Sequence, residues 1–216
     1  MRLFKCESCG GVLFFENSRC MTCDRAIGYC AEAAKLVALP EKPPEGGGPE
    51  TVDVALPGGK QEPFMRCKNF VEHDTCNWLV RAADGQPYCL SCRLTEIIPD
   101  LSDAKNRQAW AEVESAKRRV LYTLRALRLP LSTKAENAQA GLSFRFLRGT
   151  EEAPVTTGHA DGLITVNVAE ADAAYRENMR EKLGEGYRTV LGHLRHEIGH
   201  YYWDRLVRDG GQLESF

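Results

Sequence analysis

The chain has 216 residues, of which 43% are hydrophobic and 27% are charged, and its formal net charge is −2. These values are ordinary for a soluble globular protein with room for one medium domain and one or two small modules. The slightly negative charge argues against a surface built throughout to hold nucleic acid. No apolar run reaches the length of a membrane span, and Cys6 comes before any signal-like apolar segment can form. We therefore expect a cytoplasmic protein with no membrane partner.

The nine cysteines are the first strong signal. Six of them form three C-x-x-C pairs, namely Cys6/Cys9, Cys20/Cys23 and Cys89/Cys92. Such a pair points two thiolates at one metal ion. Because no secretion signal accompanies the cysteines, metal binding is favoured over disulfide formation.

Residues 1–39 are predicted to form a zinc ribbon. Its ligands are Cys6, Cys9, Cys20 and Cys23, which lie in two knuckles around a short aromatic strand. Gly10 and Gly11 follow the first knuckle, where a tight turn with positive φ is needed. A segment this short buries little apolar surface, so a bound zinc ion has to supply stability.

Residues 40–63 contain six prolines and five glycines, which is typical of a linker or a long mobile loop. A second four-thiolate zinc module is predicted over residues 64–98. Its ligands are Cys67, Cys76, Cys89 and Cys92, and His73 could replace one of the first two. Cys30 remains as a small buried apolar residue.

Residues 99–216 are predicted to be an α+β domain. A helix of roughly 25 residues follows Pro99, entered at Asp100 or Ser102. Strands are expected over residues 142–147 and 163–168, with a turn at 158–162, a short helix over 170–183 and a final helix over 187–208. The first helix is basic and amphipathic. This pattern favours a helix that packs on the core with one solvated face, and binding to nucleic acid is the less favoured alternative.

The final helix carries His196-Glu197-Ile198-Gly199-His200. One helical turn separates His196 from His200, so their imidazoles can converge on a single zinc ion. Glu197 is placed to take a proton from metal-bound water, whose pKa the ion lowers. His193 and Asp204 share the histidine stripe of this helix. We predict one catalytic zinc ion here, besides the two structural ones.

The run from His193 to Asp204, together with the cysteine knuckles and the stretches 98–103 and 158–165, resembles the bacterial "putative zinc-binding metallopeptidase" family with N-terminal zinc ribbons. The resemblance implies a zincin-like fold, zinc at His196 and His200, and Glu197 as general base. It also implies a further region after the metal helix with a glutamate as third ligand, so the domain looks truncated at its C-terminus.

None of the remaining candidates is assigned as the third ligand. Asp204, His193 and His159 are instead expected to support the ligands through hydrogen bonds. The leading hypothesis is a peptidase that cleaves peptide or protein substrates, incomplete as this chain. The alternative is a zinc-ribbon adaptor without activity that binds protein or nucleic acid. The sequence leaves the substrate, the oligomeric state and the activity of this chain open.

Overall fold

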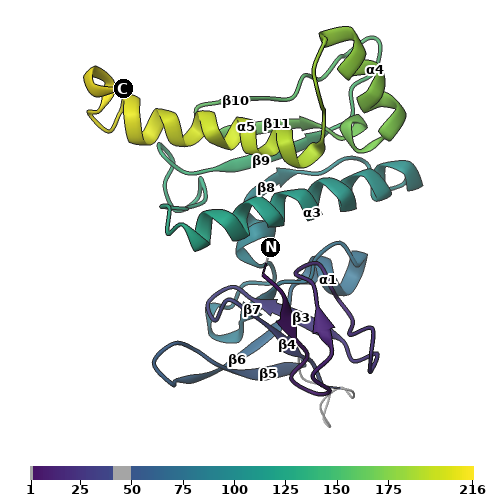
Figure 1. The fold of residues 1–216 in the computed structure, drawn as a ribbon, viewed down its shortest axis with the longest axis vertical. Helices are drawn as coiled ribbons and strands as arrows, with labels where there is room; N and C mark the ends of the chain where they lie inside the picture. Colours follow the sequence, from purple (N-terminus) through teal and green to yellow (C-terminus); the bar gives the residue numbers. More distant parts are fainter. Residues whose placement is uncertain (1, 41–49) are drawn as a thin grey trace. The chain divides into compact units, whose positions relative to one another are not determined.

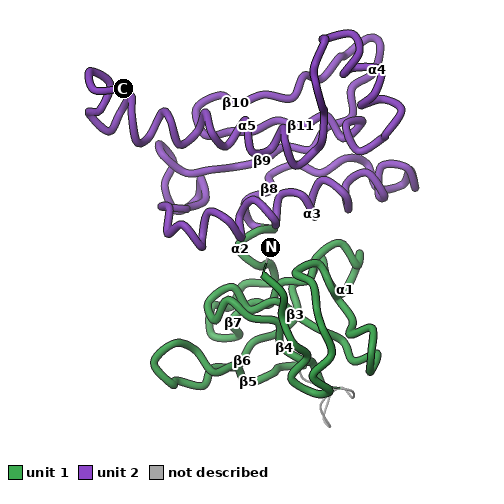
Figure 2. The backbone as a smooth tube through the Cα atoms, in the orientation of Figure 1, with its two compact units in different colours: residues 1–92 green, residues 93–216 purple. Residues whose placement is uncertain are grey.

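The computed structural model describes residues 2–40 and 50–216 (Figure 1). The chain divides into two compact units, residues 1–92 and residues 93–216 (Figure 2). Within the described ranges, no helix is both long and apolar enough to span a bilayer. The architecture is the predicted mixture of helix and sheet.

The first unit is built from short antiparallel pieces. β1 pairs with β2, β3 with β4, and β5, β6 and β7 form a three-stranded sheet in that order. The strands are β1 (Phe4–Lys5), β2 (Val12–Leu13), β3 (Ile27–Cys30), β4 (Lys35–Ala38), β5 (Thr51–Ala55), β6 (Gln61–Arg66) and β7 (Leu79–Arg81). The helical segments are α1 (Lys68–His73), a 3-10 turn (Ala82–Asp84) and α2 (Leu90–Arg93), which ends at the boundary between the units.

One aromatic core joins the two cysteine modules that the sequence suggested as separate. The ring of Tyr29 lies 4.9 Å from that of Phe15 and 5.2 Å from that of Trp78, measured between centroids. Asn77 donates a hydrogen bond from its side chain to the backbone oxygen of Phe15 at 2.6 Å. Gly28 packs directly against the side chain of Leu79, which leaves no room for a Cβ atom at position 28. The two modules therefore belong to one compact unit.

The predicted linker over residues 40–63 differs from what the structure shows. Its second half forms the β5–β6 hairpin, in which Thr51 pairs with Met65 and Ala55 with Gln61. The turn between them contains Gly58 and Gly59, whose φ angles of 93° and 84° explain the glycines there. Residues 41–49 of the predicted linker lie outside the described residues.

The second unit is a four-stranded mixed sheet with helices. The strand order is β10-β11-β9-β8, in which β9 runs parallel to both β8 and β11, and β10 is antiparallel to β11. The strands are β8 (Thr95–Ile97), β9 (Ser143–Leu147), β10 (Gly158–Ala160) and β11 (Leu163–Asn167). The helices are α3 (Ala104–Ala126), a 3-10 turn (Val168–Ala171), α4 (Ala173–Leu183), α5 (Val190–Trp203), a π-helical turn (Asp204–Arg208) and a last 3-10 turn (Leu213–Ser215).

Two local details differ from the predictions. The side chain of Asp103, rather than that of Asp100 or Ser102, caps α3 by accepting a hydrogen bond from the Lys105 amide. The predicted turn at 158–162 is mostly the edge strand β10, and only Asp161-Gly162 makes the two-residue turn into β11. Both turn residues have positive φ, 49° and 80°, as the tight hairpin turns require.

The basic face predicted for α3 is partly buried. Lys117 has no exposed surface, and its Nζ forms an ion pair of 2.9 Å with the equally buried Glu114. The same Nζ lies 5.4 and 5.3 Å from the ring centroids of Phe144 and Phe146 on β9. Helix α3 thus packs on the apolar face of the sheet, and the Lys117–Glu114 ion pair is buried between them.

Candidate metal centres

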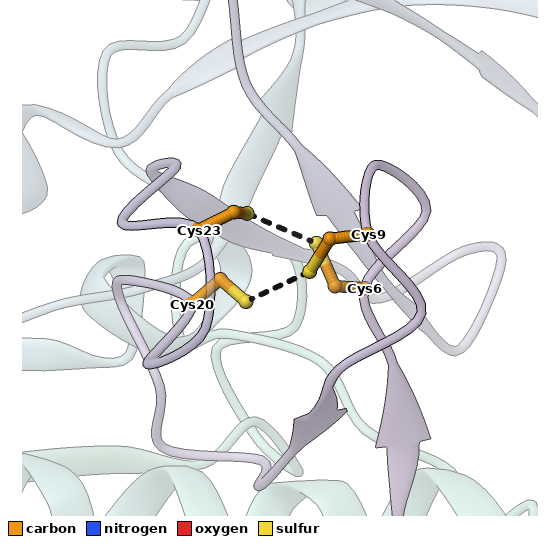
Figure 3. Close-up of side chains that lie close together, drawn as sticks. All are labelled: Cys6, Cys9, Cys20 and Cys23. Carbon is orange, nitrogen blue, oxygen red and sulfur yellow. Dashed lines mark hydrogen bonds between the residues drawn. The ribbon is translucent and has the colours of Figure 1, made fainter.

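Four cysteine sulfurs converge in the first ribbon (Figure 3). The Sγ atoms of Cys6 and Cys23 are 3.9 Å apart, and those of Cys9 and Cys20 are 3.6 Å apart. Sulfurs bound to one tetrahedral zinc ion at about 2.3 Å are separated by about 3.8 Å. A disulfide would need about 2.05 Å. The distances therefore match a closed zinc site.

The backbone of the two knuckles repeats one hydrogen-bond pattern. The amide of Cys6 donates to Gly11 O at 2.8 Å, and the amide of Gly10 donates back to Cys6 O at 2.9 Å. The amide of Cys20 donates to Arg25 O, and that of Asp24 to Cys20 O, in the same way. The amides of Cys23 and Thr22 lower the pKa of the Cys20 thiol to about 6, which favours a thiolate at Cys20, whereas the pKa of Cys9 in the same cluster is raised to about 12.

The second four-cysteine cluster is wholly buried. It comprises Cys67 just before α1, Cys76 after α1, and Cys89 and Cys92 at α2. The Sγ atoms of Cys76 and Cys89 are 3.7 Å apart, and the amides of Trp78 and Cys89 each lie 3.4 Å from a cluster sulfur. The four cysteines are grouped without His73, so the alternative ligand is not needed.

Helix α5 positions the histidine pair. The Thr189 side chain caps the helix by accepting a hydrogen bond from the Gly192 amide, and buried Leu194 and Ile198 hold its inner face. The Nε2 atoms of His196 and His200 lie 2.9 Å apart on the exposed side. Two imidazole nitrogens on one tetrahedral zinc ion are separated by about 3.3 Å. The two nitrogens thus lie within reach of a single ion.

The described residues bring no third ligand atom up to the two histidine nitrogens. Among residues 2–40 and 50–216, no further His, Cys, Asp or Glu ligand atom lies within 4.8 Å of both histidine nitrogens. The Asp204 carboxylate forms a 2.9 Å ion pair with Arg208, and the Asp204 amide donates a hydrogen bond to the backbone oxygen of His200 at the end of α5. The residues present therefore fit a zinc ion only in part.

His159 is occupied by its own hairpin. Its Nε2 accepts a hydrogen bond of 3.0 Å from the Gly162 amide, and its Nδ1 lies 4.0 Å from Asp204 Oδ2. Burial lowers the pKa of His159, so the ring is neutral near pH 7. Its contacts support the β10–β11 turn against α5.

A cavity of about 730 Å³ adjoins the histidine helix. Its lining from α5 includes His193, His196 and Glu197. Its apolar lining includes Val155, Met179 and Leu183. The wall also contains Glu170 and Arg188, which form a buried ion pair. No motif in the sequence pointed to these two residues, because they are 18 positions apart and only the fold brings them together.

The tyrosines that follow His200 act as anchors. The hydroxyl of Tyr201 donates to Ala140 O at 2.7 Å and that of Tyr202 to Pro130 O at 2.9 Å. Burial raises the pKa of both hydroxyls. These contacts tie α5 to the segment between α3 and β9.

Comparison with known proteins decides the family. Residues 106–216 match the family described as "Putative zinc-binding metallo-peptidase", and residues 3–103 match a zinc-ribbon domain. The chain belongs to this zinc-binding metallopeptidase family. The metallopeptidase match contains β9, β10, β11, α5 and the cavity, whereas the zinc-ribbon match contains both four-cysteine clusters and β8.

This chain is 38% identical over 215 residues to uncharacterized proteins of Mycobacterium bovis and of two strains of Mycobacterium tuberculosis. The matched region is the whole of this chain and 57% of each relative. No solved structure matches the chain.

Proposed function

We propose that the protein is a zinc-dependent peptidase whose metal helix is α5. The observation that carries the proposal is the convergence of the His196 and His200 Nε2 atoms, 2.9 Å apart, beside a cavity that Glu197 also lines. Membership of a zinc-binding metallopeptidase family supports the assignment. The two four-cysteine sites are structural in this proposal.

The chemistry divides between the metal and the chain. Zinc, when bound at His196 and His200, would polarise a water molecule and lower its pKa toward about 7. Glu197 would be the general base for the attacking water and the proton donor to the leaving amine nitrogen. The substrate is a peptide or protein segment that enters the cavity beside α5. The activity is proposed for the whole protein, and a catalytic zinc ion there would need a third protein ligand besides His196 and His200.

The decisive experiment replaces Glu197 by glutamine in the full-length protein. Loss of the general base is expected to lower kcat by about 100-fold to 10,000-fold, while three zinc ions per chain remain bound. Peptide cleavage and elemental analysis on the same preparations measure both. Glu177→Gln is the matched control, because Glu177 lies exposed on α4 and forms its ion pair with Arg180 on the same helix. Unchanged cleavage by the Glu197 variant would show that the assigned mechanism is wrong.

A second function, a docking adaptor without activity, is favoured by one observation. The outward face of the β1–β2 hairpin exposes Leu3, Val12 and Phe14 by 60%, 54% and 52%, and Met21 on the second knuckle is 85% exposed. Exposed apolar side chains gathered on so small a module are typical of a protein-binding surface. The zinc count separates the two functions. Two tightly held ions favour the adaptor, and a third that mild chelation removes favours the peptidase.

A further inference from the structure

The carboxylate of Glu170 lies buried in the wall of the cavity and is held in a fixed position. The Glu170 side chain is 4% exposed, and Arg188 grips both of its oxygens, Nη2 to Oε1 at 2.5 Å and Nε to Oε2 at 3.1 Å. Arg188 is fixed in turn by Glu185, which accepts two hydrogen bonds from Nη1 at 3.1 and 2.9 Å. A fork-to-fork pair with a second partner leaves the Glu170 carboxylate with one orientation.

That carboxylate faces one nitrogen of His193. The Nδ1 atom of His193 lies 3.5 Å from Glu170 Oε2 and is buried without a hydrogen-bond partner. The His193 side chain keeps 22% of its surface exposed, and the ring lines the cavity together with His196 and Glu197. One edge of the imidazole therefore faces protein and the other faces the cavity.

The Glu170 carboxylate determines whether the His193 nitrogen that faces the cavity is a hydrogen-bond donor or an acceptor. An ionised carboxylate only accepts hydrogen bonds, so it favours the tautomer with the proton on His193 Nδ1. In the neutral ring, Nε2 then carries a lone pair and is an acceptor. Burial lowers the pKa of His193, in keeping with a neutral ring near pH 7.

We propose that His193 is a substrate-binding residue, whose Nε2 accepts a hydrogen bond from a backbone N–H of the bound peptide. The inference rests on the proposed peptidase function and adds a contact that recognises the peptide backbone. In the proposed function His196 binds the metal and Glu197 transfers the proton. His193 is the other imidazole in the described cavity wall, and it is available to bind the substrate. A carboxylate-oriented ring holds its acceptor in one direction, which places an extended peptide relative to Glu197.

The test uses the full-length zinc-loaded protein and a pool of internally quenched peptides. The peptide cleaved fastest is then made with single N-methyl groups at each backbone nitrogen in turn. For His193→Ala we expect KM to rise about 10-fold while kcat and the zinc content stay unchanged, as for one lost hydrogen bond. N-methylation at one position should cost the wild type the same factor and cost His193→Ala nothing further. His193→Gln, which keeps an acceptor oxygen, should recover part of the loss.

A readout without turnover tests the orientation. In the metal-free protein, nitrogen NMR of the His193 ring should show the tautomer protonated at Nδ1 near pH 7. A proton on Nε2 would overturn the inference whatever the activity. So would an unchanged KM in His193→Ala when Glu197→Gln is inactive, and the peptidase proposal would then stand. Full activity of Glu197→Gln would instead overturn the peptidase proposal. Glu177→Gln, outside the cavity, should match the wild type in each measurement.

Discussion

In residues 1–92 the core gathers around two clusters of four sulfurs, whereas in residues 93–216 two contacting helices, α3 and α5, accompany a four-stranded sheet. The strands of the first unit are two to six residues long, so each pairing contributes few hydrogen bonds. The second unit has a 23-residue helix with eleven buried positions. We therefore expect the first unit to depend on bound zinc for its stability and the second unit to depend on its packed apolar core.

The candidate metal centres of the two units also differ, in the number of ligands and in their exposure. Each four-cysteine cluster supplies a complete set of tetrahedral ligands, and the second cluster is buried throughout. His196 and His200 are exposed and supply two ligands on an already folded helix. A closed site stabilises a fold, while an open site leaves room for water and substrate. The comparison predicts opposite consequences when ligands are removed from the two kinds of site.

The largest effect is expected for Cys89→Ser. Structural zinc contributes an apparent binding free energy of about 10–16 kcal/mol, which is of the order of a domain's whole stability. We expect residues 1–92 to lose their protection in hydrogen-exchange mass spectrometry while residues 93–216 keep theirs.

His200→Ala is the control for that comparison. The ring is exposed and lies on a helix held by buried Leu194 and Ile198, so the free energy of unfolding should change by less than about 0.5 kcal/mol. If His200→Ala unfolded the chain as Cys89→Ser is expected to, the histidine pair would belong to the structural sites.

The spacing of the cysteines was enough to predict both clusters, because zinc ligands in small modules come in local pairs such as Cys6/Cys9 and Cys89/Cys92. The β5–β6 hairpin was missed because Pro57, Gly58 and Gly59 form its turn, and turn composition resembles linker composition. β8 was missed because three residues are too few for a period-two pattern.

A smaller effect is expected inside the second unit. Lys117→Met leaves Glu114 charged and buried without its partner, which should cost roughly 3–5 kcal/mol. The free energy of unfolding in urea measures the loss. Replacing both residues, Glu114→Leu with Lys117→Met, should cost less than the single change, because no uncompensated charge remains. An equal or greater loss in the double variant would mean that the ion pair itself supplies the stability.

The candidate site was predictable only along one helix. The positions of His196, Glu197 and His200 follow from helical periodicity. The Glu170–Arg188 pair behind His193 was not predictable, since it joins the 3-10 turn after β11 to the segment that leads into α5. Contacts between segments that meet only in the folded chain leave no periodic pattern in the sequence.

The smallest effect is expected for Tyr201→Phe. Its hydroxyl donates to Ala140 O and accepts from Arg205 Nη1, both at 2.7 Å, so removal should cost about 1 kcal/mol of stability in thermal or urea unfolding. Because these partners engage the hydroxyl within the protein, kcat should not change. Tyr202→Phe, which loses one bond to Pro130 O, gives the matched comparison. A fall in kcat above about 10-fold for Tyr201→Phe alone would instead make its hydroxyl part of the chemistry, because a lost structural bond of this size lowers stability and not the rate of an intact site.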